Sequence, residues 1–144
     1  MSLFTSFSIS ASALTAERMR LDLIANNLAN INTAGNPNGN PPAYQREMPL
    51  FAQRLIEETG ADGLPVPVPG GVEVTGVVKD PSTRLKYDPG NPLADSRGYV
   101  AYPDINVVNE MVDMISAVRS YQASVTAFNA SKAMAQKALT IGKD

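Results

Sequence analysis

The chain has 144 residues, a formal net charge of −2, no cysteine and no histidine, and 44% of its residues are hydrophobic. This length allows one domain, or a small domain with long helical extensions. The near-neutral charge argues against a nucleic-acid partner, because phosphate binding needs a basic face. Without cysteine or histidine, neither a disulfide framework nor the usual zinc and histidine-based catalytic sites can form.

The N-terminal segment, residues 1–20, has neither a positively charged start nor a continuous apolar stretch. We therefore expect no cleaved secretory signal peptide. No run in the sequence approaches the roughly 18 apolar residues of a membrane span. We expect no membrane insertion.

A helix is predicted over residues 3–32, where hydrophobic residues recur every seven positions. The repeat consists of Phe7, Leu14, Leu21 and Leu28, with Ile24 and Ile31 at the alternate positions. Asn and Gly residues between positions 30 and 35 suit the end of this helix. The following residues, 34–43, predict a Pro/Asn/Gly linker, because these residue types favour turns and cannot continue a helix.

Residues 44–103 predict a small, charged, mostly β module. The valines of residues 72–78 and the apolar residues of 85–87 flank a turn sequence at 80–83, which predicts a β-hairpin across that turn. An earlier strand is indicated around residues 51–55 and a later one around 99–102. Prolines alternate with valines over residues 65–69, which indicates a polyproline-like connection.

The longest pattern runs from Asp104 to Ile141. Its hydrophobic positions alternate at steps of four and three, which is a heptad seam: Val107, Met111, Met114, Val118, Tyr121, Val125, Phe128, Lys132, Ala135 and Leu139, with only Lys132 departing. No Pro or Gly interrupts it, and Asn106 or Asp104 can cap its start. Such a helix is roughly 50 Å long. It needs a partner, because a single rod cannot bury its own stripe.

The charged residues are distributed unevenly. Only four of the 26 charged residues lie within residues 1–45, whereas fifteen lie between Arg46 and Asp104. Both terminal helices instead carry Ser, Thr, Ala and Asn, which indicates contacts on more than one side. On periodicity alone, a plain two-helix hairpin with a Ser/Ala outer face explains the pattern equally well.

We therefore predict an α+β fold with long N- and C-terminal helices paired as an antiparallel coiled coil around a small, mostly-β middle module. The segments are residues 1–33 for the first helix, 34–43 for the linker, 44–103 for the middle module and 104–144 for the second helix.

The carboxylates do not form a convincing active site. Glu57 and Glu58 are adjacent on a predicted loop or helix end, and Asp88 and Asp95 flank a loop that lacks the oxygen spacing of a calcium site. No phosphate-binding glycine loop or nucleophile elbow is present in the sequence. We therefore expect neither an enzyme nor a bound cofactor or metal.

Three stretches resemble a known family. Residues 25–33 read ANNLANINT, residues 87–100 read YDPGNPLADSRGYV, and residues 102–123 read YPDINVVNEMVDMISAVRSYQA. The first resembles a signature that flagellar rod and hook proteins share. The other two, in this order and spacing, resemble the proximal rod proteins of the FlgC type, and the resemblance covers essentially the whole chain. Asp104 and Ser124 stand where the family usually has Asn, and the 36–42 linker is longer than its typical turn.

The resemblance implies a structural subunit of the bacterial flagellar basal-body rod, in the periplasm, exported by the flagellar type III apparatus without a cleaved signal. It implies a hollow drive shaft that transmits torque, with the other rod proteins, the MS-ring junction adaptor and further copies of the chain as partners. The alternatives are a distal rod or hook protein, or a helical export chaperone or adaptor. The expected assembly interface consists of Leu14, Leu21, Ile24, Asn26, Asn27, Leu28, Asn30, Ile31, Met111, Met114, Val118, Tyr121, Gln122, Val125 and Phe128.

Overall fold

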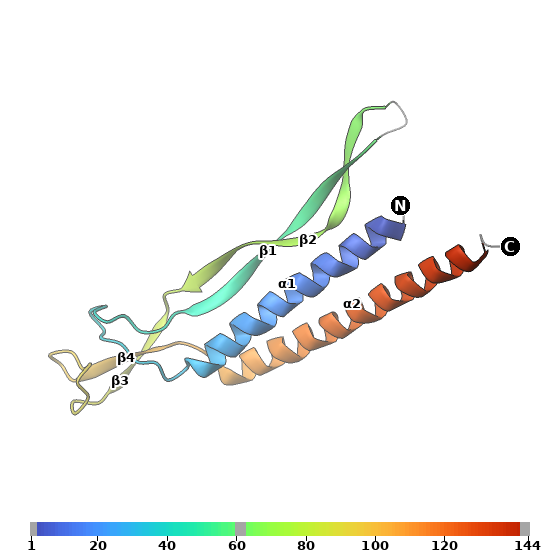
Figure 1. Cartoon of the computed structure of the whole chain (residues 1–144). Coiled ribbons are helices and arrows are strands. Elements are labelled where there is room, and N and C mark those ends of the chain that lie inside the picture. Colours follow the sequence, from blue (N-terminus) through green and yellow to red (C-terminus); the bar gives the residue numbers. More distant parts are fainter. Residues whose placement is uncertain (1–2, 60–62, 142–144) are drawn as a thin grey trace. The chain divides into compact units, whose positions relative to one another are not determined.

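The computed structural model describes residues 3–59 and 63–141. Its elements, in chain order, are α1 (Leu3–Ala29), β1 (Arg46–Thr59), β2 (Pro65–Asp80), β3 (Thr83–Tyr87), β4 (Tyr99–Pro103) and α2 (Val107–Ile141) (Figure 1). Two terminal helices with a small β region between them make an α+β fold, as predicted. Neither of these two helices is long and apolar enough to cross a membrane.

The chain divides into two compact units. Unit 1 consists of Met1–Met19, Leu50–Gly76 and Ser116–Asp144, and unit 2 consists of Arg20–Pro49 and Val77–Ile115. Each unit therefore contains a stretch of both helices and part of the β region. The two units are described separately below.

Local signals explain where the helices begin and end. The Asn106 Oδ1 atom accepts hydrogen bonds from the backbone N–H groups of Val108 at 2.9 Å and Asn109 at 3.2 Å, so Asn106 is the N-cap of α2. Helix α1 ends at Ala29, three residues earlier than predicted. The Asn30 side chain donates to the Asn26 carbonyl at 2.9 Å, which satisfies a carbonyl group of the last helical turn.

Strands β1 and β2 pair with each other in one two-stranded sheet. The polyproline-like connection predicted at residues 65–69 is therefore wrong, because these residues open β2, and Glu57 lies in β1 rather than in a loop or helix end. The side chain of Glu58 lies outside the described part of the structure. Alternating prolines are tolerated here because a two-stranded sheet has a free edge, where a missing N–H breaks no ladder bond.

The second sheet pairs β3 with β4, antiparallel, with Arg84 opposite Tyr102 and Lys86 opposite Val100. The predicted hairpin between residues 72–78 and 85–87 is wrong, because β2 takes β1 as its partner. β1 and β2 have 14 and 16 residues, so their ladder is longer than any that the 5-residue β3 could form with β2. Asp80 accepts from the Ser82 N–H at 2.9 Å, and this local turn carries the chain from one sheet to the other.

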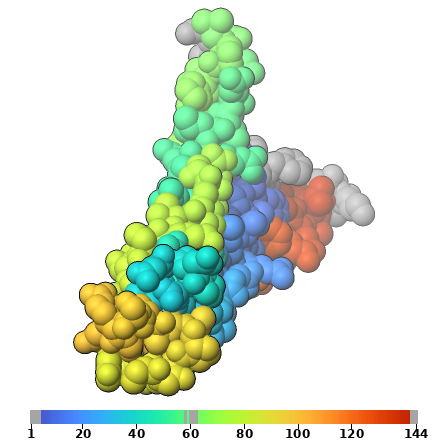
Figure 2. Space-filling model, turned by 90° about the vertical axis from the view of Figure 1, so that its left-hand side faces the viewer, coloured from blue at the N-terminus to red at the C-terminus, as the bar shows by residue number. Residues whose placement is uncertain are grey.

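Strand β4 lies at the centre of unit 2. Val100 and Ala101 are buried, and Ala101 exchanges two backbone hydrogen bonds with Gly35, at 2.8 and 2.9 Å. The linker thus pairs with the side of β4 that β3 leaves open. The Asn36 side chain also donates to the Leu93 carbonyl at 3.2 Å, and Figure 2 shows the cyan linker surface against the orange 88–98 loop.

A glycine brings β2 against α1 in unit 1. Gly71 has φ +120°, and a Cβ atom at this position would collide with the Ser12 Oγ atom. The Ser12 hydroxyl donates to the Ile9 carbonyl at 2.7 Å and accepts from the Val72 N–H at 3.1 Å. Only glycine combines this backbone angle with this close approach.

The hydrophobic core is thin. Among the described residues, the buried apolar ones are Ala16, Leu23, Ile24, Ala43, Val100, Ala101, Ile105 and Ala117. Half of these are alanines, while many large apolar side chains on α2 and on the strands are exposed. A lone chain with so small a core leaves much apolar surface for other molecules to cover.

Candidate assembly surface

Seven of the fifteen expected assembly residues lie in the second half of α1 or directly after it, within unit 2. Ile24 and Asn27 are buried, with 5% and 1% of their surface exposed, whereas Asn26 is exposed. The remaining expected residues of this half of the chain are half-buried: Leu14 in unit 1, and Leu21, Leu28, Asn30 and Ile31 in unit 2. The half-buried side chains retain apolar surface that another subunit can cover.

The heptad seam expected on α2 is buried only in part. Its positions Met114, Tyr121, Val125, Phe128 and Ala135 are half-buried, while Val107, Met111, Val118, Lys132 and Leu139 are exposed. Gln122, expected beside the seam, is also exposed. The structure buries Glu110, Ala117 and Ser131 and half-buries Ser124, and these four positions recur every seven residues, each one position before a seam residue. The most buried positions of α2 are therefore small or polar, and half-buried large side chains such as Tyr121 and Phe128 lie beside them.

The first two turns of α2 carry an exposed apolar stripe, here called the outer stripe. It consists of Val108, Met111, Val112 and Ile115, exposed by 67%, 53%, 60% and 56%. Their spacing of three, one and three residues places them on one face of the helix. Only Met111 among these four belongs to the predicted assembly residues. The repeat i, i+3, i+4, i+7 was visible in the sequence, but it competed with the longer heptad pattern.

Asn27 is the centre of a buried polar network in unit 2. Its side-chain nitrogen donates to the Glu47 carbonyl at 2.9 Å and to Glu110 Oε2 at 3.2 Å. Its Oδ1 atom accepts from the Glu47 N–H at 2.8 Å and from the Tyr44 hydroxyl at 3.1 Å. Burial, and then the charges of Glu47 and Glu110, raise the pKa of Tyr44, so this hydroxyl stays protonated as a donor. One side chain thereby holds α1, β1 and α2 together.

An ion-pair cluster continues from this network. The Arg46 guanidinium contacts Glu110 Oε1 at 2.5 Å and Asp113 at 3.6 Å, and Arg20 contacts Asp113 at 3.5 Å. Glu110 is only 1% exposed, so Arg46 and Asn27 together compensate a carboxylate that is removed from water. The oxygens of the Glu110 carboxylate contact side chains of the same chain. The ion-pair cluster therefore serves to hold the helices in position.

The shape of the 88–98 loop rests on Asp95. Asp95 Oδ1 accepts from the Tyr99 and Arg97 N–H groups, each at 2.9 Å, and Oδ2 accepts from Arg97 Nε at 3.2 Å. These bonds, above all the one from the Tyr99 N–H, lower the pKa of Asp95. Gly98 has φ +82°, which closes the turn before β4. The loop, together with Tyr87 before it and the start of β4 after it, forms the stretch YDPGNPLADSRGYV.

The site offers surfaces rather than reactive groups. Within residues 3–59 and 63–141, no three His, Cys, Asp or Glu side chains are grouped in a way that could hold a metal ion. Pairing of Glu110 with Arg46 leaves no free acid and base facing each other there. The outer stripe and the half-buried heptad seam of α2 are instead available for contact with another protein.

Two models of known protein families match parts of the chain. Residues 7–35 match the family model described as flagella basal body rod protein. Residues 96–141 match the model described as flagellar basal body rod FlgEFG protein C-terminal. The two matches cover most of α1 and the region from the end of the 88–98 loop through α2. They define the class: flagellar basal-body rod proteins.

Full-length relatives define the family within that class. The chain is 42% identical to the flagellar basal-body rod protein FlgC of Borreliella burgdorferi, over 98% of both chains. It is also 42% identical to the FlgC proteins of Escherichia coli O6:H1 and of Bacillus subtilis strain 168, over 99% of this chain and all of each relative. The chain belongs to the FlgC family of flagellar basal-body rod proteins, and it is a structural subunit of the rod.

Proposed function

We propose that the chain polymerises through its terminal helices into a hollow rod that transmits torque. The observation that carries this proposal is the outer stripe, four large apolar side chains that are each more than half exposed. Burying a Val, Ile or Met side chain contributes about 1.5–3 kcal/mol, so a neighbour that covers the stripe gains roughly 4–7 kcal/mol. A contiguous apolar patch of this kind is typical of an interaction site.

The two helices form the assembling part as an antiparallel coiled coil in this proposal. In unit 2, Arg20 contacts Asp113 while Asn27, further along α1, contacts Glu110, earlier in α2. In unit 1, the rings of Phe7 and Phe128 meet edge to face, with centroids 5.2 Å apart. In these contacts, later residues of α1 meet earlier residues of α2, which supports antiparallel pairing. The half-buried residues Met114, Tyr121 and Phe128 supply the apolar side of the pair.

Folding of the terminal helices is coupled to assembly in this proposal. Ordering a residue costs about 1–2 kcal/mol in conformational entropy, and the thin core of the single chain offsets little of that cost. Neighbouring subunits would supply the missing burial. A chain with incompletely ordered ends would also pass through a narrow export channel, which fits export by the flagellar type III apparatus without a cleaved signal.

The remaining expectations follow from the family. The rod lies in the periplasm, residues 44–103 form a middle module outside the helical layer, and the neighbours are the other rod proteins and the MS-ring junction adaptor. We propose that the chain has no catalytic activity, since the charged groups of the Asn27 network are engaged in ion pairs and hydrogen bonds.

The test replaces one residue of the outer stripe in cells that lack the native copy of the gene. Ile115→Asp places a charge on the stripe and is expected to abolish incorporation into basal bodies and swimming motility. Ser116→Asp is the matched control, because Ser116 is exposed and lies about 100° around the helix from Ile115. It is expected to assemble.

Purified basal bodies are examined by immunoblot for the chain, and swimming is scored in soft agar. Normal rods with Ile115→Asp would show that the stripe is not an assembly surface. If the native chain were found in the cytoplasm with exported proteins and never in the basal body, the rod role would fail and the chaperone reading would replace it.

A further inference from the structure

The linker of unit 2 contains a tight turn in which Asn38 is followed directly by Gly39. The Gly39 N–H group donates to the Asn36 carbonyl at 2.8 Å, and the Asn38 N–H group donates to the Asn36 Oδ1 atom at 2.8 Å. Pro37 stands at the second position of this four-residue turn, where its fixed φ is favoured. Asn38 and Gly39 are both exposed. The turn therefore presents an Asn–Gly pair to solvent.

The side-chain amide of Asn38 is not held by the fold. In the part of the chain that the structure describes, no hydrogen bond involves that amide. The Asn36 side chain differs, because it donates to the Leu93 carbonyl at 3.2 Å and accepts from the Asn38 N–H group. Gly39 is also unobstructed, since a Cβ atom added there would meet nothing within 4 Å beyond its chain neighbours. The Asn38 amide can therefore approach the Gly39 nitrogen without a collision.

We infer that Asn38 is a site of spontaneous deamidation, a covalent modification that needs only water. The Gly39 nitrogen loses its proton and attacks the Asn38 Cγ atom, so that an N–Cγ bond forms, the Cγ–Nδ2 bond breaks and ammonia leaves. Water then opens the resulting cyclic imide. Cleavage of the new N–Cγ bond gives aspartate, whereas cleavage of the original peptide bond gives isoaspartate, in which the main chain passes through Cβ. Nothing is oxidised or reduced.

The residue after an asparagine decides how readily the imide forms, although asparagine is thermolabile in general. Asn38 is the only one of the eleven asparagines in the sequence that precedes a glycine, which has no side chain to crowd the attack. The asparagines at positions 36, 40 and 91 precede prolines, whose nitrogen has no proton to lose. The sequence around Asn38 therefore favours the reaction more than any other asparagine does.

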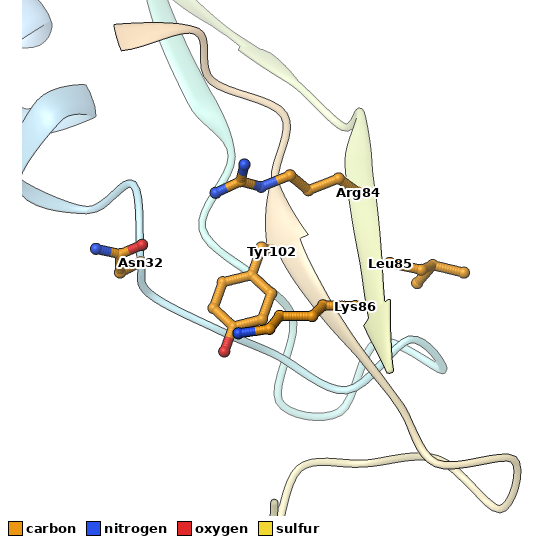
Figure 3. A pocket seen from close by; sticks show the side chains of 5 residues that line it. All are labelled: Asn32, Arg84, Leu85, Lys86 and Tyr102. Carbon is orange, nitrogen blue, oxygen red and sulfur yellow. The ribbon is translucent and has the colours of Figure 1, made fainter. Parts of the chain in front are cut away.

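Asn32 provides a matched comparison within the same unit. It is also exposed, and the N–H group of the following residue, Thr33, donates to the Asn30 carbonyl at 2.9 Å, much as Gly39 donates to Asn36. Figure 3 shows Asn32 on the loop after α1, where it lines a pocket of about 490 Å³ with Arg84, Leu85, Lys86 and Tyr102. The main difference is the β-branched side chain of Thr33, which crowds its nitrogen. Exposure alone therefore does not select Asn38.

The folded turn slows the reaction without preventing it. The attacking Gly39 nitrogen is the donor of the bond to Asn36, so this bond has to open first. A single hydrogen bond contributes little net stability, and its loss on unfolding should speed deamidation only about two- to tenfold. Residues 34–43 contain no charged side chain, so the product places the first negative charge in the linker.

The test incubates the full-length protein in mildly alkaline buffer, native and in urea, and follows it by tryptic digestion and tandem mass spectrometry. Trypsin releases residues 21–46 as one peptide with seven asparagines, so their deamidation is compared in the same spectra. In the native protein, we expect acid to accumulate at position 38 several-fold faster than at Asn32. Isoelectric focusing should show a more acidic form, and the rate in urea should be about two- to tenfold higher.

Variants separate the role of the glycine from that of the turn. Asn38→Gln should abolish the reaction at position 38 and the acidic form, because the longer side chain would have to close a six-membered ring. Thr33→Gly creates a second Asn–Gly pair, and it should raise deamidation of Asn32 several-fold toward the rate of Asn38. Asn32→Gln is the control that should leave the rate at position 38 unchanged.

Two outcomes overturn the inference. The first is a rate at position 38 that is no higher than the rate at Asn32. The second is an Asn38 that reacts in urea but stays intact in the native protein over the same time, which would show that the bond to Asn36 blocks the attack. The inference does not rest on rod assembly, since Asn38 lies outside both helices and the outer stripe.

Discussion

Asn27 and Glu110 lie 83 positions apart in the sequence and share a buried hydrogen bond of 3.2 Å. Both side chains are 1% exposed. Asn27 belongs to the ANNLAN stretch near the end of α1, and Glu110 belongs to the first turn of α2. The hydrogen bonds of Asn27 explain in physical terms why an asparagine stands in that stretch: they join the end of one terminal helix to the start of the other and to the backbone of β1.

Asn27→Ala tests the network directly. It removes the partner of the Glu47 backbone groups and one partner of Glu110, and we expect a loss of roughly 2–4 kcal/mol in the free energy of unfolding. Urea denaturation followed by circular dichroism measures this loss. Asn26→Ala is the control, because Asn26 is exposed, and it should change stability by less than about 0.5 kcal/mol. Equal losses of unfolding free energy for the two variants would show that Asn27 is not the centre of the network.

Arg46 and Glu110 should be strongly coupled. Arg46→Leu leaves the Glu110 carboxylate buried without its cation, and breaking such a pair costs about 3–5 kcal/mol. The double variant Arg46→Leu, Glu110→Leu should lose less than the sum of the single variants, with a coupling of about 1–3 kcal/mol in a double-mutant cycle. Additive losses would show that the ion pair contributes nothing specific.

Gly71→Ala should weaken the contact between β2 and α1 in unit 1. Alanine rarely adopts a φ of +120°, and its Cβ would collide with the Ser12 hydroxyl, so we expect a loss of about 1–3 kcal/mol, seen as a lower melting temperature. Gly76→Ala lies in the same strand, with nothing within 4 Å of the added atom, and it should be tolerated. Adding Ser12→Ala to Gly71→Ala removes the hydroxyl group with which the new Cβ collides. This double variant should recover only part of the lost stability, because the backbone strain at position 71 remains.

Asp95 predicts a pH dependence in the 88–98 loop. The pKa of Asp95 is lowered from its ordinary value of 3.8, mainly by the Tyr99 N–H. A lowered pKa means that the folded state favours the charged form, so the stabilisation is complete above about pH 4 and is lost as pH falls through the folded-state pKa. Asp95→Asn should therefore speed amide exchange at Tyr99 at neutral pH, and the difference from the native chain should shrink as pH falls through the lowered pKa of Asp95. A difference that persists unchanged in acid would rule out the carboxylate as its source.

The helices were predictable because their signals are local. The seven-residue repeats, the absence of Pro and Gly over residues 107–141, and Asn106 as an N-cap all act within a few turns of the backbone. The existence of strands near residues 51–55 and 99–102 was predictable for the same reason. The predicted assembly residues, by contrast, combined side chains that the structure buries, such as Asn27, with side chains that it exposes, such as Met111.

By itself, the sequence determined the two terminal helices, the β region between them and the family resemblance, since each depends on residue type at short spacing. Only the tertiary structure decided which strands pair and which face of α2 turns inward. β2 pairs with β1 because that ladder is longer than one with β3, and α2 turns Glu110 and Ala117 inward because Asn27 and Arg46 meet the carboxylate there. The strand pairing and the orientation of α2 depend on contacts between groups that are far apart along the chain. A local sequence pattern does not predict such contacts.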